Sequence, residues 1–168
     1  PNSWQWSAAD KLFLKLLQEA KSRDMRVILD GVWNHTGTRH FAFRDVVKNQ
    51  AKSRFRPWYE LISFDFPQTE RNEFNYHGWH GYKSLPALRK SGDNLANEPK
   101  AYIFACTRRW MDPNGDGDPS DGIDGWRLDV AEELPIGFWC EWHALVRSIN
   151  SEAFTAAEIW GPSAHFIE

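Results

Sequence analysis

Apolar residues recur at helical spacing near the start of the chain. One stripe of a helix would carry Leu12, Phe13, Leu16, Leu17 and Ala20. Ser7 and Asp10 have the spacing of a capping box at its start. The short β-rich run Met25-Arg26-Val27-Ile28-Leu29 follows and leads into Asp30-Gly31-Val32-Trp33-Asn34-His35. This pattern predicts an amphipathic helix and then a buried strand that ends in polar residues.

The periodicity stops between residues 36 and 97, which are rich in glycine, proline, asparagine and aromatic residues. A segment of this length is too long for a simple loop in a compact domain. Its aromatic content is too high for a disordered chain. We therefore expect an inserted subdomain made of small strands and turns, with boundaries at about 39–98.

Regular patterns return in the last part of the chain. A helix that begins near Pro99 would share one face among Tyr102, Ile103, Cys106 and Trp110. A strand over 125–130, a helix over 136–148 and a strand over 154–159 follow. In the second helix, the positions expected to be buried are Phe138, Trp142, Leu145 and Val146. Alternation of strands and helices predicts parallel βα units, in the segments 1–38 and 99–168 on either side of the insertion.

Composition narrows the class of protein. The 168 residues suit one ordinary domain, and a net charge of −3 lacks the basic footprint of a nucleic-acid-binding protein. No apolar run approaches the roughly 18 residues of a membrane span. The N-terminus lacks both a Met and the features of a signal peptide, so the compartment cannot be read. Cys106 and Cys140 are too few for a disulfide framework or a zinc site, and we expect two half-buried thiols.

The ten tryptophans exceed what core packing usually needs, since each indole N–H needs a hydrogen-bond acceptor. The flat C–H faces of sugar rings stack on aromatic rings, so the composition weakly favours a carbohydrate-binding protein. A bulky core with a few surface rings is the alternative.

Charged and polar residues fall at the ends of three predicted strands. Asp30, Asn34 and His35 follow the first strand, Arg127 and Asp129 lie near the end of the second, and Glu158 lies near the end of the third. The carboxyl ends of parallel strands meet on one face. Arg127 and Asp129 point the same way, so the arginine favours an ionised carboxylate suited to a nucleophile. Glu158 could stay protonated as a general acid in drier surroundings.

Each of these residues also has a plain structural interpretation. The Arg127–Asp129 pair could be a salt bridge between layers of the fold. Glu158 could be a helix-capping or surface carboxylate, and His35 a hydrogen-bonded histidine of the core. The coincidence of all of them on successive strand ends favours the catalytic interpretation.

Three motifs in this order resemble those of the α-amylase superfamily. They are Asp30-x-Val32-x-Asn34-His35, Gly125-x-Arg127-x-Asp129 and Ala157-Glu158-Ile159-Trp160. The insertion also falls after the first motif, as it does in that family. The segments 79–88 and 110–129 are most similar to the neopullulanase, cyclomaltodextrinase and maltogenic amylase branch. The resemblance implies an α/β fold, a partial (β/α)8 TIM barrel with about strands 3 to 5 and a subdomain inserted after the first strand present.

The resemblance also implies roles for individual residues. Asp129 would be the nucleophile of a retaining hydrolase of α-1,4-glucosidic bonds, and Glu158 its acid and base. Arg127 would orient Asp129, Asp30 would support Arg127, and His35 would bind the sugar at the cleaved bond. Trp79 and Tyr82 are candidates for sugar stacking. The substrates would be starch-like oligosaccharides, cyclodextrins or pullulan, with no organic cofactor implied and a homo-oligomer left open.

Three other interpretations stay open, and the most remote is an unrelated α/β binding domain, whose Trp fluorescence carbohydrate would not change. A transglycosylase of the same family would use the same catalytic residues. A non-catalytic homologue that binds sugar or a partner would usually lack the nucleophile or the acid, and this chain retains both. The third acidic residue of the family has no counterpart here, and three strands cannot close an eight-stranded barrel. We therefore expect a fragment that is inactive alone and marginally stable, because strand edges and apolar faces stay bare.

A dense set of oxygen ligands precedes the second motif. Asp112, Asn114, Asp116 and Asp118 resemble the first half of a calcium loop, but Ile123 stands where an EF-hand has its glutamate. Ca2+ binding and a solvated turn cluster are the two alternatives for this loop. The resemblance adds Asn34 as a weaker candidate calcium ligand.

Overall fold

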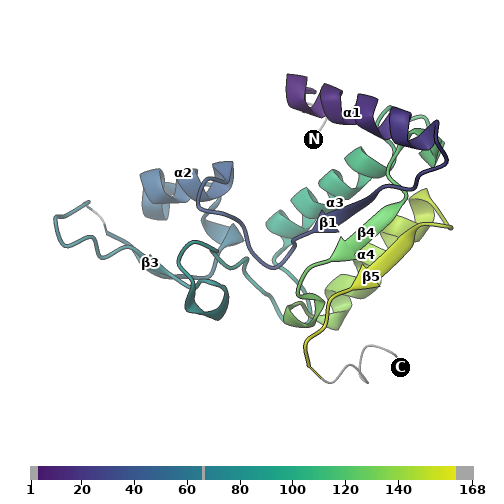
Figure 1. Ribbon diagram of the computed structural model, residues 1–168. Helices are drawn as coiled ribbons and strands as arrows, with labels where there is room; N and C mark the ends of the chain where they lie inside the picture. The colour runs from purple at the N-terminus through teal and green to yellow at the C-terminus, as the bar shows by residue number, and fades with distance from the viewer. Residues whose placement is uncertain (1–3, 66, 162–168) are drawn as a thin grey trace.

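Strands β1 (Ile28–Gly31), β4 (Gly125–Leu128) and β5 (Phe154–Ala157) form a parallel sheet in the order β1-β4-β5. The computed structural model describes residues 4–65 and 67–161, so the ends of both predicted outer segments lie outside the described residues. Helices α3 (Asn97–Met111) and α4 (Ile136–Ile149) make the crossovers into β4 and β5 and pack against each other, as Figure 1 shows. The predicted parallel βα units are therefore confirmed.

Helix α1 (Ala8–Lys21) begins as predicted. The Ser7 hydroxyl accepts from the Asp10 amide, and the Asp10 carboxylate accepts from the Ser7 amide, which makes a complete capping box. The predicted apolar stripe is only partly buried, however. Leu17 is buried, whereas Leu12 is 69% and Leu16 62% exposed, because no described element covers that side of the helix.

The strands are shorter than predicted, or displaced. The first begins at Ile28 rather than Met25, whose side chain is exposed, and the second ends at Leu128 rather than Val130. Val130 has φ 41° and ψ 52°, the left-handed region, so the extended strand cannot continue through it. The third strand ends at Ala157, which leaves Glu158 on the residue immediately after it.

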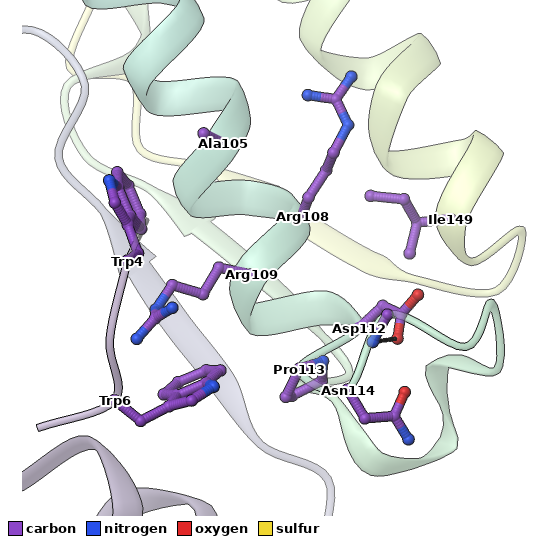
Figure 2. A pocket seen from close by; sticks show the side chains of 10 residues that line it. Trp4, Trp6, Ala105, Arg108, Arg109, Asp112, Pro113, Asn114 and Ile149 are labelled. Atoms are coloured by element: carbon purple, nitrogen blue, oxygen red, sulfur yellow. Dashed lines mark hydrogen bonds between the residues drawn. The ribbon is translucent and has the colours of Figure 1, made fainter. Parts of the chain in front are cut away.

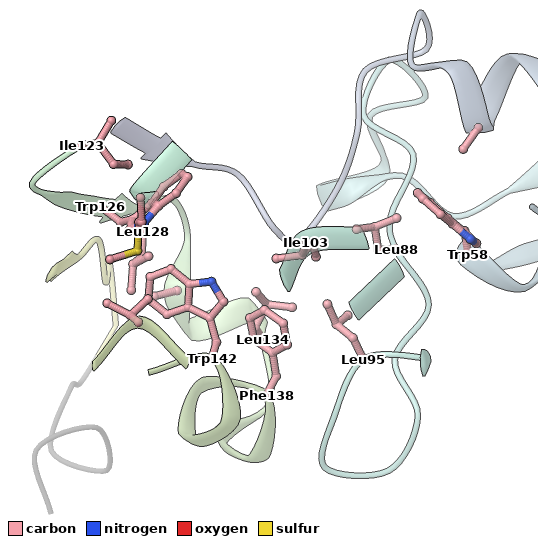
Figure 3. Packing of buried hydrophobic residues seen from close by; sticks show 14 of the residues in the cluster. Trp58, Leu88, Leu95, Ile103, Ile123, Trp126, Leu128, Leu134, Phe138 and Trp142 are labelled. Carbon is pink, nitrogen blue, oxygen red and sulfur yellow. The ribbon is translucent and has the colours of Figure 1, made fainter. Parts of the chain in front are cut away.

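The core lies between the sheet and helices α3 and α4. Alternation along β4 directs Trp126 and Leu128 to the helix side, where the Trp126 ring meets Trp142 of α4 edge to face. Figure 3 shows Trp142 and Phe138 of α4 in this packing. All four positions predicted to be buried on this helix are buried. Arg127, between the two core residues, therefore lies on the opposite face of the sheet.

Residues between β1 and α3 form small elements of their own. Helix α2 (Phe41–Asn49) and the antiparallel strands β2 (Leu61–Ser63) and β3 (Asn75–Tyr76) are set apart from the parallel sheet in Figure 1. The small strands and turns agree with the prediction, but α2 was not predicted. It is only nine residues long and is capped by the His40 ring instead of a usual capping residue.

The two thiols differ in exposure. Cys106 on α3 is half-buried, as predicted, and burial raises its pKa to about 11. Cys140 on α4 is exposed, so the prediction of two half-buried thiols is wrong for this residue. No helix among the described residues is long and apolar enough to cross a membrane.

Candidate active site

Strand register brings the predicted charged residues together. Asp30 pairs with Arg127, and Leu128 pairs with Ala157, so Asp129 and Glu158 each follow the last paired residue of neighbouring strands. Hydrogen bonds between neighbouring strands also hold the main chain of both residues. The Asp129 amide donates to the Gly31 carbonyl, and the Glu158 amide donates to the Leu128 carbonyl. The carboxyl ends of the three strands thus converge as predicted.

The Arg127 guanidinium joins three carboxylates. Its Nη1 lies 2.7 Å from Asp30 Oδ1 and 2.7 Å from Asp129 Oδ1, and its Nη2 lies 2.7 Å from Glu158 Oε2. These side chains are partly open to solvent, with 56% of Asp30 and 21% of Asp129 exposed. The hydrogen bonds that Arg127 donates to Asp30 and Asp129, in that order, raise the pKa of Arg127. The arginine is therefore a fixed positive charge at the centre of the site.

Glu158 does not lie in the dry surroundings that the sequence suggested. Hydrogen bonds from the Trp160 side chain and the Val130 amide, together with the Arg127 charge, lower the pKa of the Glu158 carboxyl. Its side chain is 30% exposed. The condition of drier surroundings, under which the sequence allowed a protonated Glu158, is therefore not met in this arrangement.

His35 lies beside the charged cluster. The residue is only 8% exposed, and burial lowers the pKa of its imidazole, while the Asp129 and Glu133 charges oppose that change. The ring stacks on Trp79, with centroids 5.4 Å apart and an angle of 14° between the planes. His35 and Trp79 are thus brought together, whereas Tyr82 is 61% exposed and lies at the surface.

A tight turn presents Trp79. A Cβ added at Gly78 would lie 2.0 Å from the Tyr82 carbonyl oxygen, so only glycine fits this approach of the main chain. The Trp79 indole N–H donates to Glu133.

Sequence reasoning missed Glu132 and Glu133, which lie on the short 3-10 helix η5 (Ala131–Glu133). The Glu132 carboxylate accepts from the amides of Trp160 and Gly161, directly after the β5 strand end. The only signal in the sequence was their position, three and four residues after Asp129.

A cavity of about 480 Å³ adjoins the site. Asp30 and His35 contribute to its wall, together with the aromatic rings of Trp33, Tyr102 and Trp126. The buried indole N–H groups of Trp33 and Trp126 have no hydrogen-bond partner among the described residues. The wall of the site on the β1 side is thus apolar and aromatic.

The acidic loop, which carries Asp112, Asn114, Asp116 and Asp118, lies before β4. It is at the opposite end of this strand from Asp129. Its oxygens accept from the loop's own amides: Asp112 from Gly115 and Gly117, Asn114 from Asp116, and Asp116 from Asp118. The Asp118 carboxylate likewise accepts from the Ser120 amide. Across residues 4–65 and 67–161, no three His, Cys, Asp or Glu side chains are grouped to hold a metal.

These contacts are those of a turn cluster. The carboxylates keep further acceptor sites, so Ca2+ binding by the four loop residues stays a prediction. Asn34 is buried beside His35, with its Nδ2 3.5 Å from the His35 Nδ1. It has no carboxylate cluster around it either.

A second cavity, of about 640 Å³, lies away from the strand ends, along α3 and the loop that follows it. Figure 2 shows the Arg109 guanidinium between Trp4 and Trp6, and its carbon Cζ lies 3.4 Å from the centroid of the Trp6 ring. The arginine covers these rings, so this cavity lacks the open aromatic face that a sugar needs.

The comparisons with known proteins agree with the motifs. The family model described as alpha amylase, catalytic domain, matches residues 7–168. Neopullulanase 2 of Thermoactinomyces vulgaris is 39% identical over 149 residues, which are 88% of this chain and 23% of that protein. A Bacillus cyclomaltodextrinase is 30% identical over 154 residues, covering 92% of this chain and 25% of its own length.

A solved structure has the same arrangement of elements. The debranching enzyme of Nostoc punctiforme, from a crystal soaked with acarbose, superposes with a TM-score of 0.77 at 34% identity. The match covers 95% of this chain and 32% of that enzyme. The chain therefore spans about a quarter to a third of the length of these relatives.

Proposed function

Because the chain belongs to the alpha-amylase catalytic-domain family, we propose that it supplies the nucleophile and the acid of a retaining α-glucosidic hydrolase. The observation that carries the proposal is the Arg127 guanidinium, which holds Asp129 and Glu158 at 2.7 Å on neighbouring strand ends. Two carboxylates that share one guanidinium are compatible with the separation of about 5 Å that retaining enzymes use.

In the proposed reaction, the Asp129 carboxylate attacks the anomeric carbon and forms a glycosyl ester. The bond to the leaving oxygen breaks, and that oxygen takes a proton from Glu158. Water then attacks the anomeric carbon of the glycosyl ester and gives a proton to Glu158, and the bond from that carbon to the Asp129 oxygen breaks, which releases Asp129. The hydrogen bonds from the Trp160 side chain and the Val130 amide, with the Arg127 charge, lower the pKa of Glu158, so these contacts oppose its protonation before the first step.

The proposed substrates are α-1,4-linked glucans such as starch-like oligosaccharides, cyclodextrins and pullulan. The support is the neopullulanase and cyclomaltodextrinase names of the relatives. His35 would bind the sugar at the cleaved bond, and the exposed ring of Tyr82 would stack on a further sugar. The proposed reaction needs no Ca2+, and Ca2+ binding by Asp112, Asn114, Asp116 and Asp118 stays a separate prediction.

The site can be tested in a chimera in which residues 7–161 replace the corresponding segment of the Thermoactinomyces neopullulanase 2. We expect the chimera to hydrolyse pullulan or a cyclodextrin with the α-anomer as first product. Asp129→Asn should abolish turnover, and Glu158→Gln should lower it by about 10²–10⁴-fold. A 5-fluoroglucosyl fluoride should label the peptide that contains Asp129, as seen by mass spectrometry.

Glu152→Gln is the matched control, because this exposed carboxylate lies outside the cluster. A folded chimera whose activity survives Asp129→Asn would refute the proposal. Hydrolysis of α-1,6 bonds alone would retain the catalytic residues but refute the α-1,4 preference.

A further inference from the structure

The turn after Asp129 is bound to the next strand. Val130 adopts the left-handed region although it is β-branched, which is a strained conformation. Its amide donates to the Glu158 carboxylate at 3.2 Å, and the Ala131 amide donates to the Glu158 carbonyl at 2.9 Å. These contacts hold η5 in place, so the side chains of Glu132 and Glu133 start from a fixed main chain.

Glu133 gathers three side chains from the segment between β1 and α3. Its Oε1 lies 3.3 Å from the Trp79 indole nitrogen and 3.3 Å from His80 Nε2, and its Oε2 lies 3.8 Å from Lys90 Nζ. The carboxylate is about one-third exposed. It therefore ties the Trp79 turn to the strand that carries Asp129.

Trp79 connects Glu133 to His35 through the stacked rings described above. The main chain of His35 is held separately, by a β-bridge to Ala87 and by the Leu88 amide, which donates to the Asn34 carbonyl. Loss of the Trp79 contact would consequently remove the stacking partner of the His35 ring, and would leave its contact with the Asn34 side chain and its main chain in place.

We propose that Glu133 is a positioning residue, which holds Trp79 against His35 and so fixes the imidazole at the candidate active site. The benefit to catalysis rests on the proposed function, in which His35 binds the sugar at the cleaved bond. Glu132 is the matched control, because its carboxylate accepts from the main-chain amides of Trp160 and Gly161 and not from the Trp79 indole.

The test uses NMR on the 168-residue chain. A stacked indole shifts the His35 ring protons upfield, and Trp79→Leu defines the complete loss of that shift. Glu133→Ala should cause more than half of the loss of upfield shift that Trp79→Leu causes. It should also move the Trp79 indole N–H resonance. Glu133→Gln keeps a neutral acceptor and should show a smaller change, whereas Glu132→Gln should leave the His35 signals in place.

The outcomes separate positioning from general stability. Urea unfolding of each variant shows how far the fold is weakened, and the Glu133→Gln spectrum serves if Glu133→Ala does not fold. Unchanged His35 signals in a folded Glu133 variant, or an equal change in Glu132→Gln, would overturn the proposal. The NMR readout needs no turnover, so failure of the hydrolase assay would not affect this result. Failure of the NMR test would likewise leave the proposed hydrolase function untouched.

Discussion

At the scale of single residues, the arginine at the centre of the carboxylate cluster has the largest consequences. Arg127 contacts Asp30, Asp129 and Glu158, so its removal leaves three negative charges facing one another. We expect Arg127→Ala to lower the urea midpoint of the chain at pH 7. Arg127→Lys should lower it less, because a lysine keeps the charge but cannot bridge in the same planar geometry.

The pH dependence follows from Glu158. Its pKa is lowered in the folded chain, so its stabilisation is present at neutral pH and is lost as the pH falls through the folded pKa. Part of the lowering comes from Arg127. The difference between wild type and Arg127→Ala should therefore shrink below about pH 4, near the ordinary value of a glutamate. Urea midpoints measured from pH 7 to pH 3 check this, and a constant difference would contradict it.

Val130 gives a second prediction at this scale. In ordinary strands and helices, glycine is less favourable than alanine by roughly 0.5–1 kcal/mol. The left-handed conformation costs a residue with a Cβ roughly 1–2 kcal/mol, which glycine avoids. At Val130, with φ 41°, we expect the order to reverse, so that Val130→Gly is at least as stable as Val130→Ala.

Val130 is only 3% exposed, so both variants lose buried contacts and should be less stable than wild type. Val130→Gly also loses Cβ, so a glycine variant at least as stable as the alanine variant must gain from the main-chain conformation. Urea unfolding measures the order, and a Val130→Ala variant clearly more stable than Val130→Gly would contradict the prediction.

At the scale of elements, helix α1 tests how far an apolar stripe reports burial. Leu17 is 1% exposed and belongs to the core, so Leu17→Ala should lower the free energy of unfolding by about 2–5 kcal/mol. Leu12 is 69% exposed, so Leu12→Ala should change it by no more than about 0.5 kcal/mol. Similar losses in the two variants would mean that another surface covers Leu12 in solution.

The same helix shows which parts of the fold the sequence could predict. The capping box at Ser7 and the buried face of α4 depend on neighbours a few residues away, so local patterns located them. The Arg127 cluster joins Arg127 to Asp30, 97 positions away, and it was predictable only because parallel strand ends meet. The Glu133 contact with Trp79, 54 positions away, follows no periodicity and could not be predicted.

The protonation state of Glu158 was beyond sequence reasoning for a different reason. Its pKa depends on hydrogen bonds from Trp160 and Val130 that only the folded turn creates. Likewise, the spacing of the acidic loop was right for oxygen ligands. The orientation of those oxygens toward the loop's own amides was not encoded in that spacing.

At the scale of the whole molecule, the sheet has unpaired edges on β1 and β5 within the described residues. The outer face of α1 and the Phe154 side chain on β5 are exposed and apolar. Exposed edges and apolar faces favour pairing with other chains. The buried indole N–H groups of Trp33 and Trp126 also lack a hydrogen-bond acceptor among the described residues. Unpaired polar groups are therefore found on the β1 side of the molecule.

This openness argues that the 168-residue chain alone does not hydrolyse glucans. Glycosidic cleavage depends on electrostatic interactions that are strong where water is excluded. Here Asp30 is 56% and Arg127 36% exposed, and β1 has no partner on its outer side. We expect no release of reducing sugar from pullulan or cyclodextrin by the isolated chain, under conditions in which the neopullulanase chimera is active. The control is Asp129→Asn in the same preparation, because turnover by the chain that this variant abolishes would show that three strands suffice to build the site.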